Sequence, residues 1–512
     1  MPLFEVPQLS TKAKDIELLK KAKTRTKVTT TTKSSGNLVN KINTIKALVE
    51  THLGKFADET IIIQDEQTLS DYIDKCLENG ICAIDTETTG LDPLQDELVG
   101  VGIYTPGEKT SYIPINHISY VTGQRVKNQL DLEVVGKYLA MLQDCCSRPY
   151  CDIDMFNASF DIRFIKAHTG TRLKCTWDAY LASRCLNENE PNKGLKKLHQ
   201  KYILKGEEDA FKFDELFKGL NFAYVPIKTA ALYAAHDPKI TYEYADYQRD
   251  VFRKREDLKD VNWVFENIEM PIVDVVVDME DNGIAFDMEY NAKLKEKYHN
   301  LLDEKLAEFQ KAYHMYDAEI AQYSGKVRLD NPINIASVPQ LQTLLYDIIG
   351  LKGPIDKKTK EPSRSTSEES LKANKDNAVV KAILEYREFA TIVSTFIDKL
   401  PDCVNKKDGR IHCKFNQYGA DTGRFSSQDP NMQNLPSHVK DIRPMFVATH
   451  YDKQVDFDTD EFLEVDKFTE LQTDDGWVKT STLSIGDKLS IDGDIFTISS
   501  VEIGDSTVRI FL

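Results

Sequence analysis

The segment Ala83-Ile84-Asp85-Thr86-Glu87-Thr88-Thr89-Gly90 decides the fold class of the first half of the chain. It completes the apolar run 81–84 and has the pattern of a buried strand that ends in polar residues. Side chains two residues apart on a strand share a face, so Asp85 and Glu87 point at one spot. Adjacent carboxylates repel unless a cation or a proton lies between them, and hard oxygen ligands suit Mg²⁺ or Mn²⁺. Acids at a strand end are also common at surface turns, so the pair alone is not decisive.

The flanking sequence predicts an α/β domain over residues 59–250. Apolar and β-branched runs predict strands at 60–63, 81–86, 98–104 and 109–115. Apolar residues at helical spacing predict helices at 69–78, 132–143, 158–168 and 176–186. Strands followed by helices, with a crossover between them, are typical of an α/β fold.

Two further acids lie downstream at helical positions. Asp161 falls in the first turn of an apolar-faced helix, where an acid is also favourable against the helix dipole. Asp237 ends the segment 232–237, and Tyr233 lies one turn earlier on the same face. His236 is adjacent to Asp237 and is expected to face elsewhere. Neither piece is decisive by itself.

Together and in order, these pieces resemble the proofreading nucleases of the DEDD superfamily, in the tyrosine-type variant. The resemblance implies a ribonuclease H-like 3′→5′ exonuclease that uses two divalent ions, Mg²⁺ or Mn²⁺. It implies metal ligation by Asp85, Glu87, Asp161 and Asp237. It also implies that Tyr233 orients the attacking water and that Asn157 contacts the substrate. Two alternatives remain for Leu91 and Phe160: each could pack against the terminal bases of the substrate or in the protein core.

Residues 251–450 are mainly helical and resemble part of the family A DNA polymerases. The string Thr422-Gly423-Arg424-Phe425-Ser426-Ser427-Gln428-Asp429-Pro430-Asn431-Met432-Gln433-Asn434-Leu435-Pro436 carries most of this resemblance. Its polar groups can bond phosphates and minor-groove acceptors, although a polar loop beside a hairpin is the plainer alternative. The resemblance implies a thumb and the start of a palm, with DNA contacts from Thr422, Arg424, Ser426, Ser427, Asn431, Gln433, Asn434 and Arg443.

The polymerase resemblance stops after residue 448, and we expect an incomplete polymerase site. Asp456 and Asp458 lack the flanks of a palm motif and fit a solvated acidic linker better. Residues 451–512 are acidic, with short β-prone pieces and Asp-Gly turns, and predict a small all-β module. It resembles the Hint (intein-like) fold. The joining region lacks a cysteine nucleophile, so we interpret the module as a non-splicing relic or insertion.

Composition bounds the remaining possibilities. The net charge is −17, but residues 1–58 are polar and basic at their start and predict a flexible arm. No apolar run reaches the roughly 20 residues of a membrane helix, and no signal peptide is evident, which predicts a cytoplasmic protein without membrane contact. The 9 cysteines form no CxxC pair, so free thiols are expected.

The first hypothesis is therefore a phage-like replication protein that proofreads DNA and carries the N-terminal part of a family A polymerase. Its partners would be DNA and a separately encoded palm–fingers chain. One alternative is a non-catalytic DNA-binding subunit that completes such a split polymerase. The other is a tyrosine-type RNA-trimming exonuclease, against which the string 422–436 argues.

Overall fold

The computed structural model describes residues 34–447, apart from 144–149, 207–216, 218, 356–359, 420–422 and 437, together with Leu483 and the strands between 463 and 511. The chain forms two compact units, Met1–Gly283 with Ala390–Ser437 and Ile284–Phe389 with His438–Leu512. The sequence predicts residues 251–450 as one domain, but the structure divides this segment between the two units.

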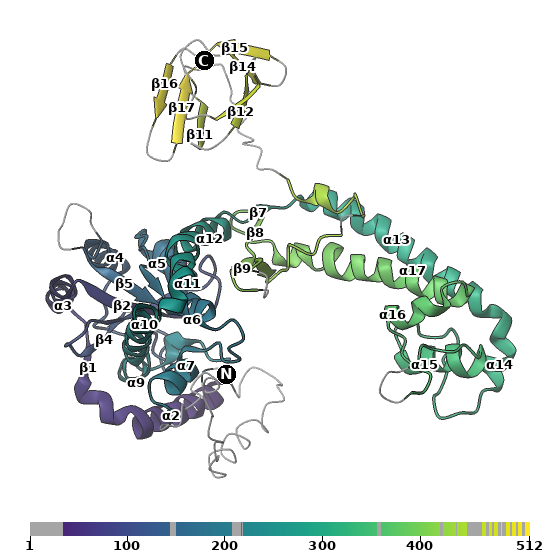
Figure 1. Ribbon diagram of the computed structural model, residues 1–512, viewed down its shortest axis with the longest axis horizontal. Helices are drawn as coiled ribbons and strands as arrows, with labels where there is room; N and C mark the ends of the chain where they lie inside the picture. The colour runs from purple at the N-terminus through teal and green to yellow at the C-terminus, as the bar shows by residue number, and fades with distance from the viewer. Residues whose placement is uncertain are drawn as a thin grey trace. The chain divides into compact units, whose positions relative to one another are not determined.

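A six-stranded mixed sheet forms the centre of the first unit (Figure 1). Its strands are β1 (Thr60–Ile62), β2 (Ile81–Thr88), β3 (Leu98–Tyr104), β4 (Thr110–Pro114), β5 (Asp152–Met155) and β6 (Trp177–Asp178). In space their order is β1-β4-β3-β2-β5-β6. The strand β2 is antiparallel to β3 and parallel to β5, so it lies inside the sheet. The four strands expected from the sequence are confirmed.

Helices cover this sheet on both faces. Figure 1 shows it between α3 (Glu66–Asn79), α4 (Leu132–Met141) and α5 (Ala158–Thr169) on one side and α9 (Ile227–Ala234) and α10 (His236–Lys254) on the other. In α3 the side chain of Asp65 caps the first turn, and Gly80 ends the helix with a φ of 69°. The expected helix at 176–186 is shorter, because Trp177–Asp178 pairs with β5 and α6 spans Ala179–Leu186.

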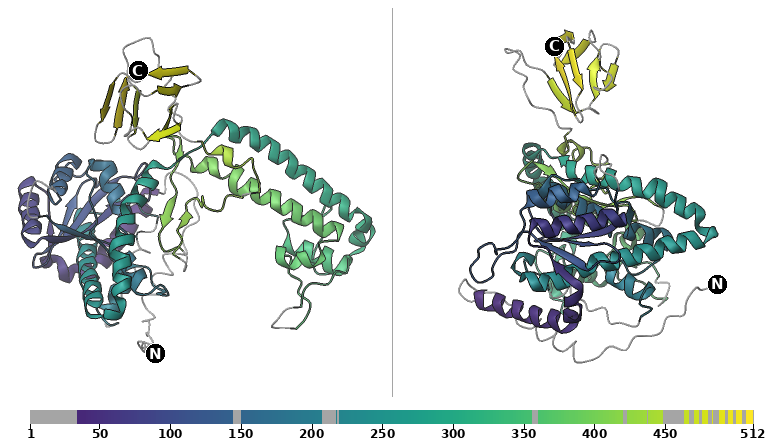
Figure 2. Two further views of the ribbon diagram at one scale, coloured as in Figure 1. Left: turned by 45° about the horizontal axis from the view of Figure 1, so that its top comes forward. Right: turned by 90° about the vertical axis from the view of Figure 1, so that its left-hand side faces the viewer.

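The flexible arm expected over 1–58 is wrong for its second half. Residues Ser34–Leu53 form the helix α2, seen in purple along the first unit (Figure 2). Ile42, Ile45 and Val49 are at most 2% exposed, and α2 packs against α9. Their spacing places all three on one helical face, and burying that face offsets the entropy of ordering a polar segment. Residues 1–33 lie outside the described residues.

Two long helices dominate the second unit. Helix α13 (Met288–Tyr313) lies beside α17 (Ala378–Ile392), and Lys305 bonds Glu385 between them at 2.9 Å. The expected helix at 286–315 is confirmed. The one expected at 378–400 is α-helical to Ile392 and continues as the π-helical η8 (Val393–Ile397).

The C-terminal residues that the structure describes form strands. Three of them, β11 (Leu463–Asp466), β17 (Thr507–Phe511) and β16 (Ser500–Ile503), make one antiparallel sheet. Four others, β13 (Gly476–Lys479), β12 (Glu470–Thr473), β14 (Lys488–Ile491) and β15 (Asp494–Thr497), make a second. Asp456 and Asp458 lie outside the described residues. Among the described helices of the whole chain, none is long and apolar enough to cross a membrane.

Candidate metal centre

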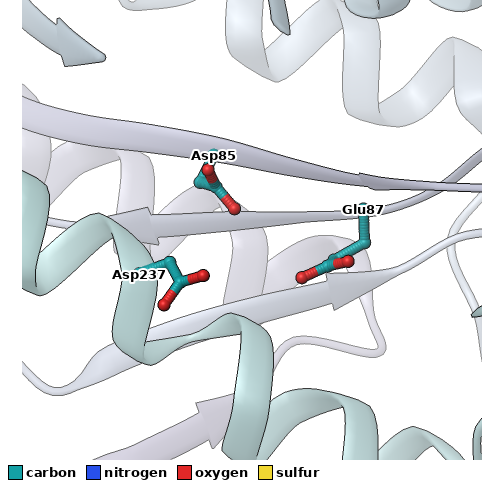
Figure 3. A group of neighbouring side chains, drawn as sticks. All are labelled: Asp85, Glu87 and Asp237. Carbon is teal, nitrogen blue, oxygen red and sulfur yellow. The ribbon is translucent and has the colours of Figure 1, made fainter. Parts of the chain in front are cut away.

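Asp85 and Glu87 lie on β2, at the middle of the sheet. Their pairing partners on β3 are Gly102 and Gly100, respectively. Both carboxylates therefore leave the sheet on one face, as their spacing predicts, and Figure 3 shows them directed toward Asp237. Because their partners on β3 are glycines, no β3 side chain stands directly opposite either acid.

Asp237 reaches the same point from the first turn of α10. The junction between α9 and α10 approaches the sheet closely: a Cβ added to Gly102 would lie 2.8 Å from Pro238 Cγ and 3.0 Å from the Ala234 carbonyl oxygen. Only a glycine at this place in β3 permits that approach. His236, next to Asp237, stacks on Phe56 with ring centroids 5.1 Å apart, so the expectation that it faces elsewhere is confirmed.

The three carboxylates form a group that fits a cation. One ligand atom from each of Asp85, Glu87 and Asp237 lies within 4.8 Å of the others. Asp237 Oδ1 is buried and accepts no hydrogen bond from the residues that the structure describes. Burial raises the pKa of Asp85 well above its usual value, and Asp161, Asp237 and Glu87 raise it further. Half-buried carboxylates in mutual repulsion, one of them with a buried oxygen that has no donor, are the arrangement that a bound cation relieves.

Asp161 adjoins this group from α5. Its Oδ1 accepts hydrogen bonds from the Thr86 backbone nitrogen at 2.9 Å and from Thr86 Oγ1 at 2.6 Å. Burial raises the pKa of Asp161 to about 7, although the two bonds from Thr86 lower it. The fourth sequence-predicted acid is thus fixed directly to the strand that carries Asp85 and Glu87.

The helix that carries Asp161 is anchored at its start and along its length. At its start, the buried Asp178 accepts from the backbone nitrogens of Asn157 at 3.0 Å and Ala158 at 2.8 Å. One turn on, Arg163 Nη1 donates to Glu280 Oε2 at 2.7 Å, and both side chains are at most 6% exposed. Glu280 belongs to α12 (Met270–Asn282). These contacts hold Asp161 in place without using its own carboxylate.

Tyr233 lies near the end of α9, four residues before Asp237, and is 9% exposed. The sequence predicts both residues on one face of a single helix, but the structure divides this segment into α9 and α10 at Ala235. A residue that the sequence reasoning missed, Lys196, lies beside both. Its Nζ is 3.0 Å from Asp237 Oδ2 and 4.1 Å from the centre of the Tyr233 ring. Burial lowers the pKa of Lys196, but Asp237 and Tyr233 outweigh that effect and raise it. No spacing rule links positions 196 and 237, so the sequence offers no signal for this contact.

A cavity of about 490 Å³ lies at the start of α5, the helix that carries Asp161. It is lined by Leu91, Asn157, Phe160, Lys193 and Lys414, among others, and not by the four acids themselves. Leu91 is 65% exposed, which removes the core-packing alternative for it. Phe160 is half-buried, and its ring centroid lies 4.8 Å from that of Phe164, so it both packs inward and faces the cavity. Asn157 is exposed at the start of α5.

The residues singled out in the string 422–436 are not equally available to a ligand. The strand β10 (Ser426–Gln428) pairs with β9 (Lys414–Asn416), as a hairpin would. The side chains of Arg424, Asn431, Gln433 and Asn434 are exposed, and Ser426 is half-buried. Ser427 is buried, and its hydroxyl donates to the Pro430 carbonyl and accepts from the Met432 nitrogen. Ser427 therefore stabilises the loop. Thr422 lies outside the described residues, and Arg443 is exposed in the second unit.

Comparisons with known proteins agree with this geometry. Residues 60–250 match the family model described as 3'-5' exonuclease, and residues 299–466 match DNA polymerase family A. The chain is 31% identical over 399 residues to a DNA polymerase I of Chloroflexus aurantiacus, covering 76% of this chain and 39% of that protein. It is 30% identical over 427 residues to a DNA polymerase I of Pseudomonas aeruginosa, covering 81% and 43%.

A solved structure gives the same picture for the fold. The polymerase domain of Pol1 from M. smegmatis, in complex with a DNA primer-template and dNTP, matches with a TM-score of 0.57 and 19% identity, over 81% of this chain and 60% of that one. The chain spans about two fifths of the length of the two curated relatives above. It is a homologue of the family A DNA polymerases, with a 3′-5′ exonuclease region and part of the polymerase region.

Proposed function

We propose that the exonuclease region hydrolyses DNA from its 3′ end, with divalent cations held by Asp85, Glu87, Asp161 and Asp237. The observation that carries this proposal is the group of carboxylate oxygens of Asp85, Glu87 and Asp237 within 4.8 Å of one another, with one buried oxygen lacking a donor. Oxygen ligands of this kind favour Mg²⁺ or Mn²⁺ over softer metals.

Different residues of the chain would have different roles around such ions. Two divalent ions, when bound, would activate a water and stabilise the leaving 3′ oxygen. Asp161 is held by Thr86 through Oδ1, which assigns the ligand role to Oδ2. Tyr233 has a hydroxyl that can donate and accept, and we assign it to orienting the attacking water. The anchoring of α5 and the close approach of α10 supply the fixed geometry that such a reaction requires.

We propose that the cavity at the start of α5, the helix that carries Asp161, takes the single-stranded 3′ end. Lys193 and Lys414 can pair with phosphates, Asn157 can bond a base or sugar, and Leu91 and Phe160 offer apolar surface to bases. In the polymerase region, the exposed Arg424, Asn431, Gln433 and Asn434, with Ser426, are proposed to contact a primer–template junction. For Arg443 and Thr422, contact with the primer–template junction stays a prediction.

Degradation of end-labelled single-stranded DNA in Mg²⁺ tests the proposal. The double variant Asp85→Ala with Glu87→Ala is expected to lose activity by at least about 10³-fold, because two ligands of one cation are removed. Tyr233→Phe is expected to lower kcat more than it raises KM. Unchanged activity in the double variant, with folding verified by circular dichroism, would show that these acids are not the nuclease site.

A second measurement separates DNA from RNA as the substrate. The string 422–436 favours DNA, because a loop that contacts a primer–template has no role in RNA trimming. Matched DNA and RNA oligonucleotides should therefore be degraded at different rates, with DNA faster. Faster RNA degradation would favour the RNA-trimming alternative. Primer extension with the purified chain, alone and beside any co-purifying polypeptide, tests the predicted palm–fingers partner and the DNA-binding-subunit alternative.

The finer family assignments are also proposals. The spatial order β4-β3-β2-β5-β6, with β3 antiparallel to both neighbours, supports a ribonuclease H-like fold. Tyr233, four residues before Asp237 in the chain, supports the tyrosine type. The antiparallel strands between 463 and 511 support a Hint-like module, which we propose is separate from the nuclease. Removing residues 451–512 should leave exonuclease activity unchanged. A phage-like origin is tested by the genes that flank the coding sequence.

A further inference from the structure

Lys196 places a positive charge at the edge of the carboxylate group of the proposed nuclease site, against Asp237. It is the second residue of α7 (Leu195–Tyr202), and its side chain is 26% exposed. Its ammonium contacts Asp237 Oδ2 at 3.0 Å and covers the Tyr233 ring at 4.1 Å. Its charge also reaches Asp85, whose pKa burial raises and Lys196 lowers. One lysine thus acts on two of the proposed metal ligands and on the tyrosine.

The position of Lys196 is fixed by the fold. Helix α7 packs against α10, the helix that carries Asp237. One turn after Lys196, His199 Nε2 lies 2.7 Å from Glu243 Oε2 on α10, and His199 is buried. Lys197, the next residue, is exposed. The contact with Asp237 therefore belongs to one particular lysine of this helix.

We propose that Lys196 is a resident cation that competes with the divalent ion for Asp237 and so couples metal binding to DNA binding. This inference rests on the proposed function. A divalent ion on Asp85, Glu87 and Asp237 would lie within a few ångströms of the ammonium, and like charges at that distance repel in a partly buried site. The ammonium must then leave Asp237 or weaken the binding of the ion.

A phosphodiester of the bound DNA would remove this repulsion between the ammonium and the divalent ion. It offers the ammonium an anionic partner, so that Lys196 can exchange Asp237 for a phosphate oxygen while the carboxylate passes to the divalent ion. Lys196 becomes a positioning residue in the free protein and a substrate contact in the complex. The coupling is reciprocal: DNA tightens the binding of the ion, and the ion tightens the binding of DNA.

Calorimetric titration with Mn²⁺ tests the inference apart from activity. The full chain is titrated with Mn²⁺, alone and with a short oligothymidylate whose 3′-terminal linkages are phosphorothioates that resist cleavage. For the wild type we expect weak binding of Mn²⁺ alone and at least about tenfold tighter binding with the oligonucleotide, within the usual range of couplings between sites. Lys196→Met should bind Mn²⁺ at least about tenfold more tightly without DNA and gain little from it.

Two matched variants complete the experiment. Lys197→Met removes the same charge one residue away and should behave as the wild type. Lys196→Arg keeps a cation and should retain most of the coupling. Thermal unfolding in EDTA shows whether Lys196→Met still folds. If this variant has a lower melting temperature but the same affinity for Mn²⁺ as Lys197→Met, Lys196 forms only a structural ion pair, and the inference is overturned.

The outcome also separates the two proposals. If the wild type and the Asp85→Ala variant bind Mn²⁺ identically, the proposed metal site itself fails. If Asp85→Ala abolishes the binding while Lys196→Met leaves the affinity for Mn²⁺ and its dependence on DNA unchanged, the metal site stands and the role of Lys196 fails.

Discussion

Gly102 lies opposite Asp85 on β3 and lets the α9–α10 junction approach the sheet. In Gly102→Ala the new Cβ would lie 2.8 Å from Pro238 Cγ and 3.0 Å from the Ala234 carbonyl oxygen. Ordinary carbon–carbon contacts need about 3.5–4.0 Å, so the junction must retreat by roughly 0.5–1 Å. Asp237 directly precedes Pro238 and moves with it, away from Asp85 and Glu87.

The displacement should affect catalysis more than folding. Overpacking of this kind costs about 1–3 kcal/mol of the free energy of unfolding. A misplacement near 1 Å in a catalytic group can cost about 10²-fold, so we expect kcat for single-stranded DNA to fall by about 10- to 100-fold. The affinity for Mn²⁺ should fall as well, because one of three clustered ligands has moved.

Degradation rates at saturating DNA, measured well below the melting temperature, give kcat for the variant. Gly54→Ala is the control, since its Cβ would meet only Glu50 Cγ at 4.0 Å. Adding Pro238→Ala to Gly102→Ala removes the closest contact and should restore part of the activity in a double-mutant cycle. If Gly102→Ala loses stability but keeps kcat within about twofold of the wild type, the close approach of α10 does not set the metal geometry.

Three further changes test the surroundings of the site. Thr86→Val removes the 2.6 Å hydroxyl bond to Asp161 and should lower kcat about tenfold in the same assay, with little change in KM; an equal rise in KM would assign Thr86 to substrate binding. Arg249→Met leaves the buried Asp154 without its ion pair and should cost about 3–5 kcal/mol in urea unfolding, against a surface control such as Arg253→Met. Burial lowers the pKa of His117 to about 4, so the unfolded chain binds the extra proton between pH 6.5 and 4. Stability should therefore fall as the pH drops through that window, by up to about 3 kcal/mol, and His117→Asn should flatten this part of the profile.

Local spacing in the sequence was enough to predict that Asp85 and Glu87 share a face, whereas the expectation that all four acids gather came from the resemblance to a known nuclease family. Asp85 and Glu87 are two residues apart on one strand, so they share a face in any fold that keeps that strand. Tyr233 and Asp237 are four residues apart but lie on consecutive helices, α9 and α10, so spacing on a single helix does not describe this pair. The run Leu98–Tyr104 is continuous and apolar because β3 lies inside the sheet, and its bounds follow from that run alone.

Spacing could not reveal contacts between distant segments. Lys196 looks like any charged residue of a short polar helix until α7 packs on α10 and brings it to Asp237. The polar composition of residues 1–58 concealed the stripe of Ile42, Ile45 and Val49, whose partner surface on α9 lies nearly 200 residues away. Composition measures how much apolar surface a segment has, but burial depends on whether another element presents a matching face.

The sequence by itself determined the strands of the sheet and the shared face of Asp85 and Glu87, because both depend on periodicity within single elements. The other two acids and the tyrosine came from the resemblance of their motifs to a known family. The tertiary structure alone decided how close they come. Gly102 allows α10 to approach β3, and Thr86 fixes Asp161 to β2. Lys196 adds a positive charge beside Asp237 that no local sequence pattern predicts. Each of these is a contact between segments far apart in the chain, and only packing in three dimensions determines which side chains meet.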